Sequence, residues 1–232
     1  MFKNFKYSWV YLALLTGVIA IAVGGICKFA YSDTSATPNP KVIIIDAGHG
    51  GFDPGARYNG LSEKDINLQI AHCLADIFRL DGYKVVMTRE SDISTDTAGE
   101  TTAQKKRSDL QNRLEVMKKY PDGVFLSIHQ NAFSGKSSGS QVFYRYDCSD
   151  SETLANAIQN SIVENLQKDN KRQHKATKND YYLIRNATVP AVLIECGFLS
   201  NAKEAKLLLD KEYQLKLCLC ILNGVNQFLN VT

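Results

Sequence analysis

The chain has 232 residues, which is enough for one ordinary domain with an appendage but not for two full domains. Hydrophobic residues make up 44% and charged residues 22% of it, a composition that excludes a disordered, collagen-like or coiled-coil protein. The 27 basic and 24 acidic residues leave a net charge of +3, so charge does not indicate a nucleic-acid partner. Six cysteines without a CxxC pair do not indicate a disulfide framework in a chain of this length.

An apolar segment at residues 9–27 is the first distinctive feature along the chain. It reads WVYLALLTGVIAIAVGGIC and has no charged residue. As a helix it would span about 28 Å, close to the hydrocarbon thickness of a membrane. Lys3 and Lys6 precede it, so the positive-inside rule predicts a cytoplasmic N-terminus at 1–8 and an exported remainder. A cleaved signal peptide is the alternative, but its apolar core is usually shorter, about 7–15 residues. We therefore expect a transmembrane anchor at 9–27 and a polar linker at 28–40.

Short β-branched runs alternate with segments of helical periodicity from residue 41 onward. Strands are predicted at 42–46, 83–88, 123–128, 141–146 and 191–195. Helices are predicted from apolar stripes within 66–78, 110–117, 154–166 and 217–228, and Ser62 is the expected cap of the first. Polar loops are expected at 92–106 and 168–180. This alternation predicts an α/β domain at 41–232, in which helices cover both faces of a mostly parallel twisted sheet.

Histidine and glutamate residues follow the predicted strands. His49 comes after the first strand, His129 after the third, and Glu195 ends the last, while Glu63 opens the first helix. The carboxyl ends of parallel strands meet at one edge of a sheet, where α/β proteins place their chemistry. Two imidazoles and a carboxylate, with a fourth position left to water, are typical of a catalytic zinc. Glu195 is the carboxylate expected to remain off the metal and move protons.

Each of these residues also has a plainer interpretation. His49 suits a polar loop, and Glu63 suits the start of a helix, where an acid interacts favourably with the helix dipole. His129 alone could serve hydrogen bonding in the core. The glycines that surround His49 could indicate a phosphate site, but the GxGxxG and GxxxxGK[ST] patterns are absent. His72 and His174 are interpreted as structural or surface residues.

Five segments together resemble a known family, the zinc-dependent N-acetylmuramoyl-L-alanine amidases of the amidase-3 type. They are DAGHGGFDPGA (46–56), SEKDINL (62–68), TRESD (88–92), SIHQNA (127–132) and PAVLIECGFLSN (190–201). The resemblance implies one zinc ion per chain, bound by His49, Glu63 and His129, and a catalytic role for Glu195. It implies cleavage of the amide between N-acetylmuramic acid and L-alanine in peptidoglycan.

Within this family the chain is similar to sporulation amidases that have one membrane segment and a bare catalytic domain. That similarity implies work on spore cortex, before muramic-δ-lactam formation, in the space between the forespore and mother-cell membranes. It implies an extracytoplasmic catalytic domain that acts on glycan strands with stem peptides and has no nucleic-acid partner. A protein partner is expected, since 41–232 leaves no room for wall-binding repeats. Asn131 is expected to help position the substrate. Two alternatives stay open, a zinc carboxypeptidase of stem peptides and a membrane-tethered wall-binding protein.

Overall fold

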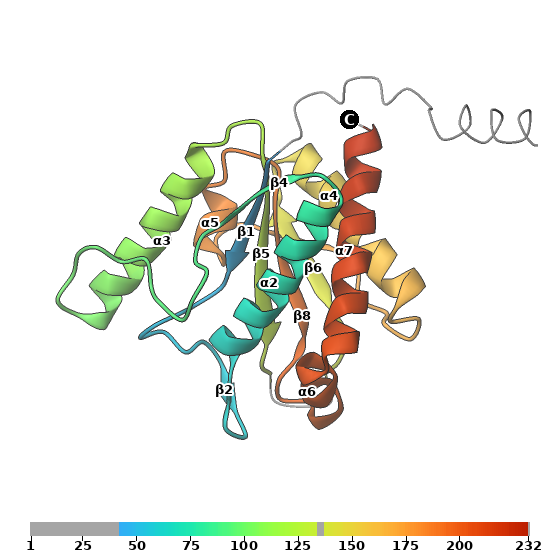
Figure 1. Ribbon diagram of the computed structural model, residues 1–232, viewed down its shortest axis with the longest axis horizontal. Helices are drawn as coiled ribbons and strands as arrows, with labels where there is room; N and C mark the ends of the chain where they lie inside the picture. Colours follow the sequence, from blue (N-terminus) through green and yellow to red (C-terminus); the bar gives the residue numbers. More distant parts are fainter. Residues whose placement is uncertain (1–41, 134–136, 232) are drawn as a thin grey trace, which may run out of the picture. The chain divides into compact units, whose positions relative to one another are not determined.

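Six strands form the central sheet of the protein, seen here in a computed structural model that describes residues 42–133 and 137–231 (Figure 1). The strands lie in the order β4-β1-β5-β8-β6-β7. Neighbouring strands are parallel except for β6 and β8, which confirms the predicted mostly parallel sheet. The strand bounds are β1 Val42–Ala47, β4 Lys84–Met87, β5 Val124–Asn131, β6 Gln141–Arg145, β7 Lys175–Thr177 and β8 Ala191–Phe198.

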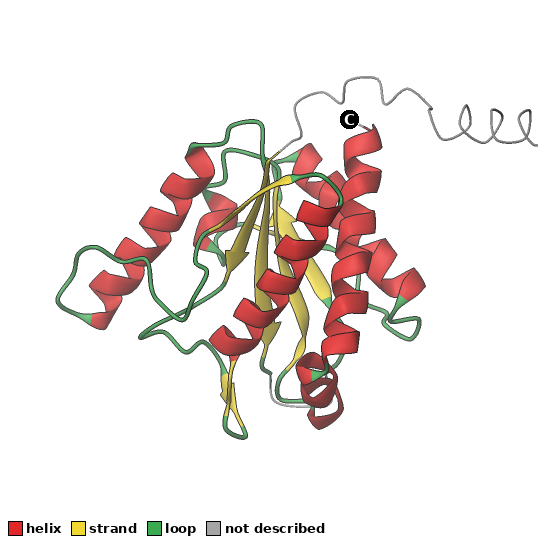
Figure 2. Cartoon of the chain, in the orientation of Figure 1, coloured by secondary structure: helices red, strands yellow, loops and turns green. Residues whose placement is uncertain are grey.

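Helices cover both faces of this sheet, as the sequence predicts (Figure 2). One face packs against α2 Glu63–Leu80, α4 Ser149–Asn165 and α7 Lys211–Val231, and the other packs against α3 Thr102–Lys118 and the short α5 Tyr182–Arg185. The remaining elements are α6 Ala202–Leu209 and a small hairpin of β2 Arg57–Tyr58 and β3 Leu61–Ser62.

The strand β1 shows how one apolar run serves both faces. Ile43 and Ile45 belong to the core under α2, α4 and α7, whereas Ile44 belongs to the core under α3 and α5. All three are fully buried, because successive side chains of a strand point to opposite faces. Burial of each such side chain is worth about 1.5–3 kcal/mol, so this run fixes the strand in the middle of the sheet.

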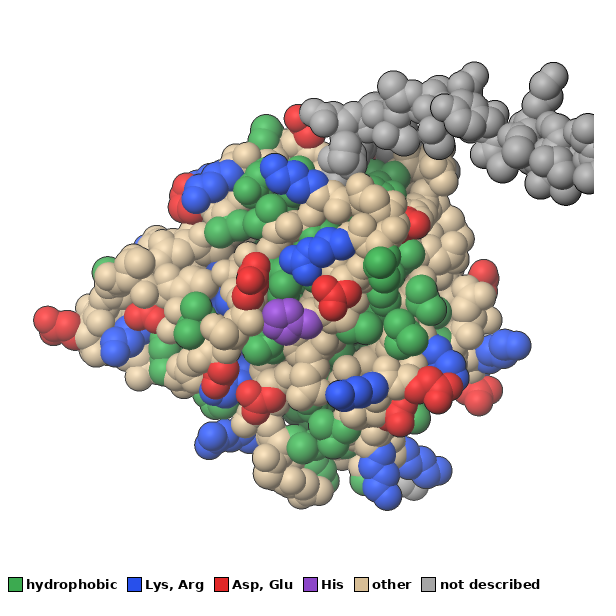
Figure 3. Space-filling model, viewed as in Figure 1, with side chains coloured by type: hydrophobic (Ala, Val, Ile, Leu, Met, Phe, Trp, Pro, Cys, Tyr) green, Lys and Arg blue, Asp and Glu red, His purple; other side chains and the backbone are tan. Residues whose placement is uncertain are grey.

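The helix α7 has one buried and one exposed side. Leu217, Ile221 and Val225 are fully buried, whereas Leu215 and Leu219 are 44% and 48% exposed. Hydrophobic side chains accordingly reach the surface along this helix, on the face that Figure 3 shows. Lys, Arg, Asp and Glu side chains are interspersed over the rest of that face rather than separated by sign.

The start of α2 differs from the expected Ser62 cap. Ser62 is the N-cap residue, but its side chain makes no cap hydrogen bond. The first backbone N–H groups of the helix instead donate to loop carbonyls: Glu63 N to Ala56 O at 2.9 Å and Lys64 N to Pro54 O at 3.2 Å. The loop after β1 therefore satisfies the free donors of the helix start, which ties the loop to α2.

Both predicted polar loops are partly wrong. Helix α3 already begins at Thr102, and Thr101 and Gln104 form a capping box, so a segment poor in apolar residues still starts a helix. The loop before it is held by Thr95, whose N–H and hydroxyl donate to the Asp109 carboxylate at 2.6 and 2.8 Å. Within 168–180, β7 pairs with β6 at the edge of the sheet.

The expected transmembrane helix at 9–27 and linker at 28–40 lie outside the described residues. Among the residues that the structure describes, no helix is long and apolar enough to span a bilayer. The described residues, 42–133 and 137–231, belong to one compact unit.

The soluble fragment 33–232 is therefore expected to fold without the first 32 residues, because every described strand and helix begins after residue 41. Circular dichroism during urea unfolding should show a single cooperative transition with full secondary structure. An insoluble fragment, or a broad non-cooperative transition, would contradict this division of the chain.

Candidate metal centre

The carboxyl ends of β1, β5 and β8 bring the predicted site residues together. His129 on β5 pairs in register with Glu195 on β8. Phe125, four residues before His129, and Leu193, two residues before Glu195, belong to the core under α3 and α5. Because side chains alternate along a strand, these even spacings turn His129 and Glu195 to that same face. Two residues that are 66 positions apart in sequence thus become neighbours through the parallel pairing.

His49 reaches the same place through a tight turn after β1. Gly48 donates its N–H to Ile128 O at 3.1 Å, which holds the turn against β5. A Cβ atom at Gly48 would overlap the ring of His129, so only glycine allows this approach. His49 has a φ of 63°, a left-handed conformation that is uncommon for a residue with a side chain. Such strain is typical of functional sites, where the surroundings hold the residue in place.

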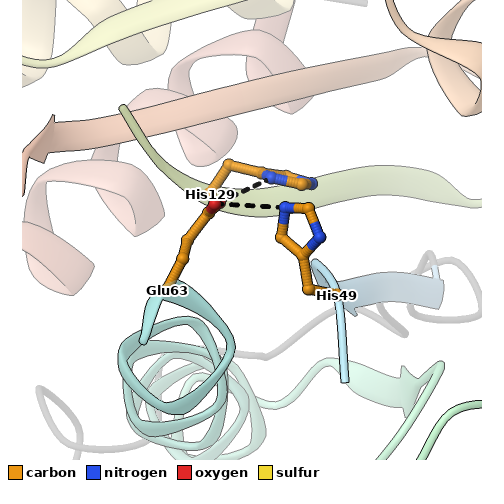
Figure 4. Close-up of side chains that lie close together, drawn as sticks. All are labelled: His49, Glu63 and His129. Carbon is orange, nitrogen blue, oxygen red and sulfur yellow. Dashed lines mark hydrogen bonds and ion pairs between the residues drawn. The ribbon is translucent and has the colours of Figure 1, made fainter. Parts of the chain in front are cut away.

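Glu63, the first residue of α2, lies between the two histidines (Figure 4). Its Oε2 is 3.1 Å from Nε2 of His49, and its Oε1 is 2.9 Å from Nδ1 of His129. One ligand atom from each of the three residues lies within 4.8 Å of the others. The structure therefore brings together the three residues that the sequence predicts as metal ligands; their role as ligands stays a prediction.

Backbone and side-chain donors fix the Glu63 carboxylate. The N–H groups of Ala56 and Gln130 donate to it at 2.9 and 3.0 Å, and the side chain of Asn67 donates at 3.3 Å. Burial alone would raise the pKa of Glu63, but the hydrogen bonds and charges of His129 and His49 lower it far below its usual range. The carboxylate is thus ionised and preoriented.

The charges around His49 favour a cation at this site. Asp53 accepts from Nδ1 of His49 at 2.9 Å and is itself paired with Nζ of Lys106 at 2.9 Å. Burial lowers the pKa of His49, but Asp53 and Glu63 outweigh it and raise that pKa to about 9. The negative charges of Asp53 and Glu63 stabilise a proton on His49, and they would stabilise a divalent cation at this site in the same way. Two imidazoles, a carboxylate and an outer carboxylate on one imidazole fit a zinc site, since such outer partners orient metal-bound histidines.

Glu195 is set apart from this cluster. It is 7% exposed, and its Oε2 has no hydrogen-bond partner within the described part of the chain. Burial raises its pKa to about 7, with a further increase from Glu63 and a decrease from His129 and His49. A carboxyl with a pKa near neutrality can both accept and release a proton at working pH.

These residues line a cavity of about 320 Å³ between the sheet edge and the helices α3 and α5. Its polar lining includes His49, Glu63, His129 and Glu195. Apolar and aromatic side chains form much of the rest of the lining: Leu110, Tyr181, Tyr182, Leu183, Ile184 and Leu193. Asn131 lies at the end of β5 and is absent from this lining, so its proposed part in substrate binding stays a prediction.

Sequence reasoning missed the buried charges that support the site. Arg113 on α3 donates to Asp46 at 2.8 Å, to Asp109 at 2.9 Å, and to His49 O at 2.6 Å. Arg89 donates to Ala47 O at 2.8 Å from the other side. Arg89 stands in the TRESD segment quoted above, and Arg113 ends the segment 108–113, SDLQNR. Neither arginine carries a sequence signal that assigns it this role.

Asp46 is held as an ionised carboxylate, and the two remaining histidines lie outside the cavity. Although burial raises the pKa of Asp46, Arg113 and the hydroxyls of Ser127 and Thr88 lower it to about 2. His72 bonds to Glu90 O at 2.9 Å on the outer side of α2, and His174 lies beside the Tyr144 ring. Neither of these two histidines lines the cavity, as the sequence predicts.

Comparison with known proteins gives concordant matches. The sequence pattern of the Amidase_3 family, described as N-acetylmuramoyl-L-alanine amidase, matches residues 43–227. The germination-specific N-acetylmuramoyl-L-alanine amidase of Bacillus subtilis is 36% identical over 231 residues, which cover 96% of this chain and 95% of that protein. The sporulation-specific N-acetylmuramoyl-L-alanine amidase of the same species is 30% identical over 192 residues, with 82% and 68% covered.

Solved structures agree with these matches. The CwlD amidase of Clostridioides difficile, in a complex with the GerS lipoprotein, has a TM-score of 0.79 and 44% identity, with 83% of this chain and 100% of that chain covered. Another N-acetylmuramoyl-L-alanine amidase of that species has a TM-score of 0.69 and 30% identity, with 83% and 98% covered. The predicted resemblance to the family, and to its sporulation amidases, is confirmed.

Replacement of Arg113 by Ala should lower the free energy of unfolding by about 3–5 kcal/mol, because it leaves Asp46 buried without its counter-ion. Chemical denaturation measures the loss. The exposed arginine of α2 provides the control: Arg79 pairs with Asp76 at 3.1 Å near the surface, and Arg79→Ala should cost less than about 1 kcal/mol. Equal effects of the two substitutions would contradict the importance assigned to the buried pair.

Proposed function

This chain belongs to the Amidase_3 family of N-acetylmuramoyl-L-alanine amidases, and we propose that it hydrolyses the amide between N-acetylmuramic acid and L-alanine in peptidoglycan with one Zn²⁺ held by His49, Glu63 and His129. The observation that carries this proposal is one cavity with two parts. It contains a compact His–Glu–His cluster and, apart from it, the unpaired carboxyl oxygen of Glu195.

Different residues of the chain have different roles in the proposed reaction. When bound, a zinc ion acts as a Lewis acid toward the amide carbonyl and lowers the pKa of a water molecule in the site. Glu195 accepts the proton of the attacking water and then donates it to the leaving nitrogen of alanine. Asp53 keeps His49 oriented through Nδ1, so that its Nε2 faces Glu63. Burial raises the pKa of Glu195 to about 7, which suits both proton transfers.

The shape and polarity of the cavity support an amide substrate of this kind. The D-lactyl group of muramic acid and the alanine residue each carry a methyl group beside the scissile bond. The apolar lining residues Leu110, Leu183 and Leu193 offer these methyl groups a matching surface in the same cavity as Glu195. The half-exposed Lys106 at the same cavity adds a positive charge for the carboxylates of the stem peptide.

The relatives support a proposal for the biological setting. We propose a role in spore cortex maturation that leads to muramic-δ-lactam, supported by the match along nearly the whole length of the germination-specific amidase. A protein partner is proposed because the CwlD structure contains the GerS lipoprotein. We retain the anchor at 9–27 and an extracytoplasmic catalytic domain at 41–232 as part of the proposal, on the basis of the uncharged apolar segment.

Replacement of His49, Glu63 or His129 by Ala should each reduce bound zinc and amidase activity together, because a three-ligand site loses both charge and geometry. Inductively coupled plasma mass spectrometry of purified variants measures the zinc. The control is His72→Ala, a histidine of α2 outside the cavity, which should keep zinc and activity near wild type. Zinc loss in the control with retention in His49→Ala would refute the ligand assignment.

The variant Glu195→Gln should keep zinc and melting temperature near wild type while turnover falls by roughly two to four orders of magnitude. The amide keeps the volume but cannot accept a proton, and this is the usual range of general acid–base catalysis. Mass spectrometry of digested muropeptides measures the release of stem peptides with a free alanine amine. The exposed Glu115→Gln serves as control, with unchanged turnover. Loss of zinc in Glu195→Gln would indicate a ligand, and release of a terminal amino acid by the wild type would indicate a carboxypeptidase.

A further inference from the structure

We propose that Cys73 and Cys218 are a reactive dithiol that closes to a disulfide between the helices α2 and α7. This site lies away from the cavity and goes beyond the amidase reaction. It was not expected from the sequence, because the two cysteines are far apart in the chain and belong to no CxxC motif.

The two helices lie side by side on one face of the sheet (Figure 1). Cys218 is fully buried, and its thiol donates to the carbonyl of Ile70 at 3.7 Å. Cys73 follows Ile70 by three residues, so it lies on the same side of α2 and faces the same part of α7. It packs against the core to which Cys218 belongs. The carbonyl of Ile70 points toward the next turn of α2, so the sulfur of Cys218 lies beside Cys73.

The other cysteines in the described residues have different surroundings. The sulfur of Cys148 accepts from the Ser151 hydroxyl at 3.2 Å, and the thiol of Cys196 donates to Ile194 O at 3.7 Å. Cys220 is two residues from Cys218 on one helix and therefore faces another direction. The packing of α2 against α7 is what sets Cys73 and Cys218 beside each other.

The two thiols also differ in a way that suits disulfide exchange. Cys73 is half-buried, and its interaction with Cys218 lowers the pKa of its thiol. The same interaction, together with burial, raises the pKa of Cys218 well above its usual value. A more accessible thiol that ionises first and a buried thiol that follows are the attacking and resolving partners of such a reaction.

The step balances with a disulfide of low-molecular-weight thiols as oxidant. The Cys73 thiolate attacks one sulfur of that disulfide, forms a mixed disulfide and releases one thiolate. Cys218 then loses its proton and attacks the Cys73 sulfur, which forms the internal bond and releases the second thiolate. Two protein thiols are oxidised by two electrons, and one small disulfide is reduced to two thiols. The bond would persist in the extracytoplasmic location proposed above, where protein disulfides are stable.

The consequence is a covalent link between two helices that otherwise only pack together. The link closes the chain from 73 to 218, which includes all of β4 to β8 and the helices between them. A closed loop of this length restricts the unfolded chain strongly and stabilises the folded one. The first residue of α2 is Glu63, so the linked helix is the one that carries a proposed metal ligand.

The test uses the full chain purified in mild detergent and incubated with glutathione disulfide. Free thiols are then blocked with iodoacetamide, and peptides are mapped without reduction. The wild type should yield one linked Cys73–Cys218 peptide and a melting temperature raised on the order of 10 °C over the reduced protein. Cys148→Ser, the matched control, should keep the link, and Cys73→Ser should lose both the link and the rise.

The proposal is overturned if Cys73 and Cys218 are both alkylated after oxidation of the folded wild type. A link between Cys218 and another cysteine in the wild type would overturn it as well, and so would an equal rise in melting temperature in Cys73→Ser. The outcome is independent of the amidase assignment, since the mapping needs no substrate. Amide cleavage by the same preparation is measured in parallel, so failure of either proposal is recognised separately.

Discussion

A buried ion pair between Arg113 and Asp46 holds the carboxyl end of β1, next to which the site is built. Both side chains are almost fully excluded from solvent, and their atoms approach to 2.8 Å. The same guanidinium donates to the carbonyls of Ala47 and His49, so one residue of α3 fixes the turn after β1. A planar group with five donors suits this task, whereas a point charge would satisfy fewer of the acceptors. The position of His49 therefore depends on a side chain 64 residues further along the chain.

Two carboxyl groups in the same cavity acquire opposite properties from their surroundings. Glu63 is surrounded by N–H donors and two imidazoles, which keep it ionised. Glu195 is as deeply buried but has an unpaired oxygen, and its pKa is raised to about 7. Such a separation of two carboxyl groups is how one site obtains a permanent anion and a proton carrier. The proposed division of roles between a metal ligand and a general base thus has a physical basis in hydrogen bonding and burial.

Much of the fold could be predicted from the sequence because its central elements are strongly periodic. The continuous apolar run of β1 and the apolar stripes of α2 and α7 indicate burial directly. The predictions failed where tertiary contacts replace local signals. Loop carbonyls of Pro54 and Ala56, rather than the Ser62 side chain, satisfy the start of α2. The edge strand β7 and the single-turn α5 are too short to show a period, and packing against the sheet defines them.

The sequence by itself determined the chemistry of this protein: an α/β domain with imidazole and carboxylate groups after its strands, in motifs typical of one amidase family. Residue type and position relative to a strand are local properties, so the chain alone reveals them. Only the tertiary structure decided that Glu63 bridges the two histidines, that Asp53 orients one of them, and that Glu195 has an unpaired oxygen. It alone brought Cys218 of α7 against α2 at Ile70, one turn before Cys73. Distances, desolvation and hydrogen-bond partners depend on which distant segments pack together, and no local pattern encodes them.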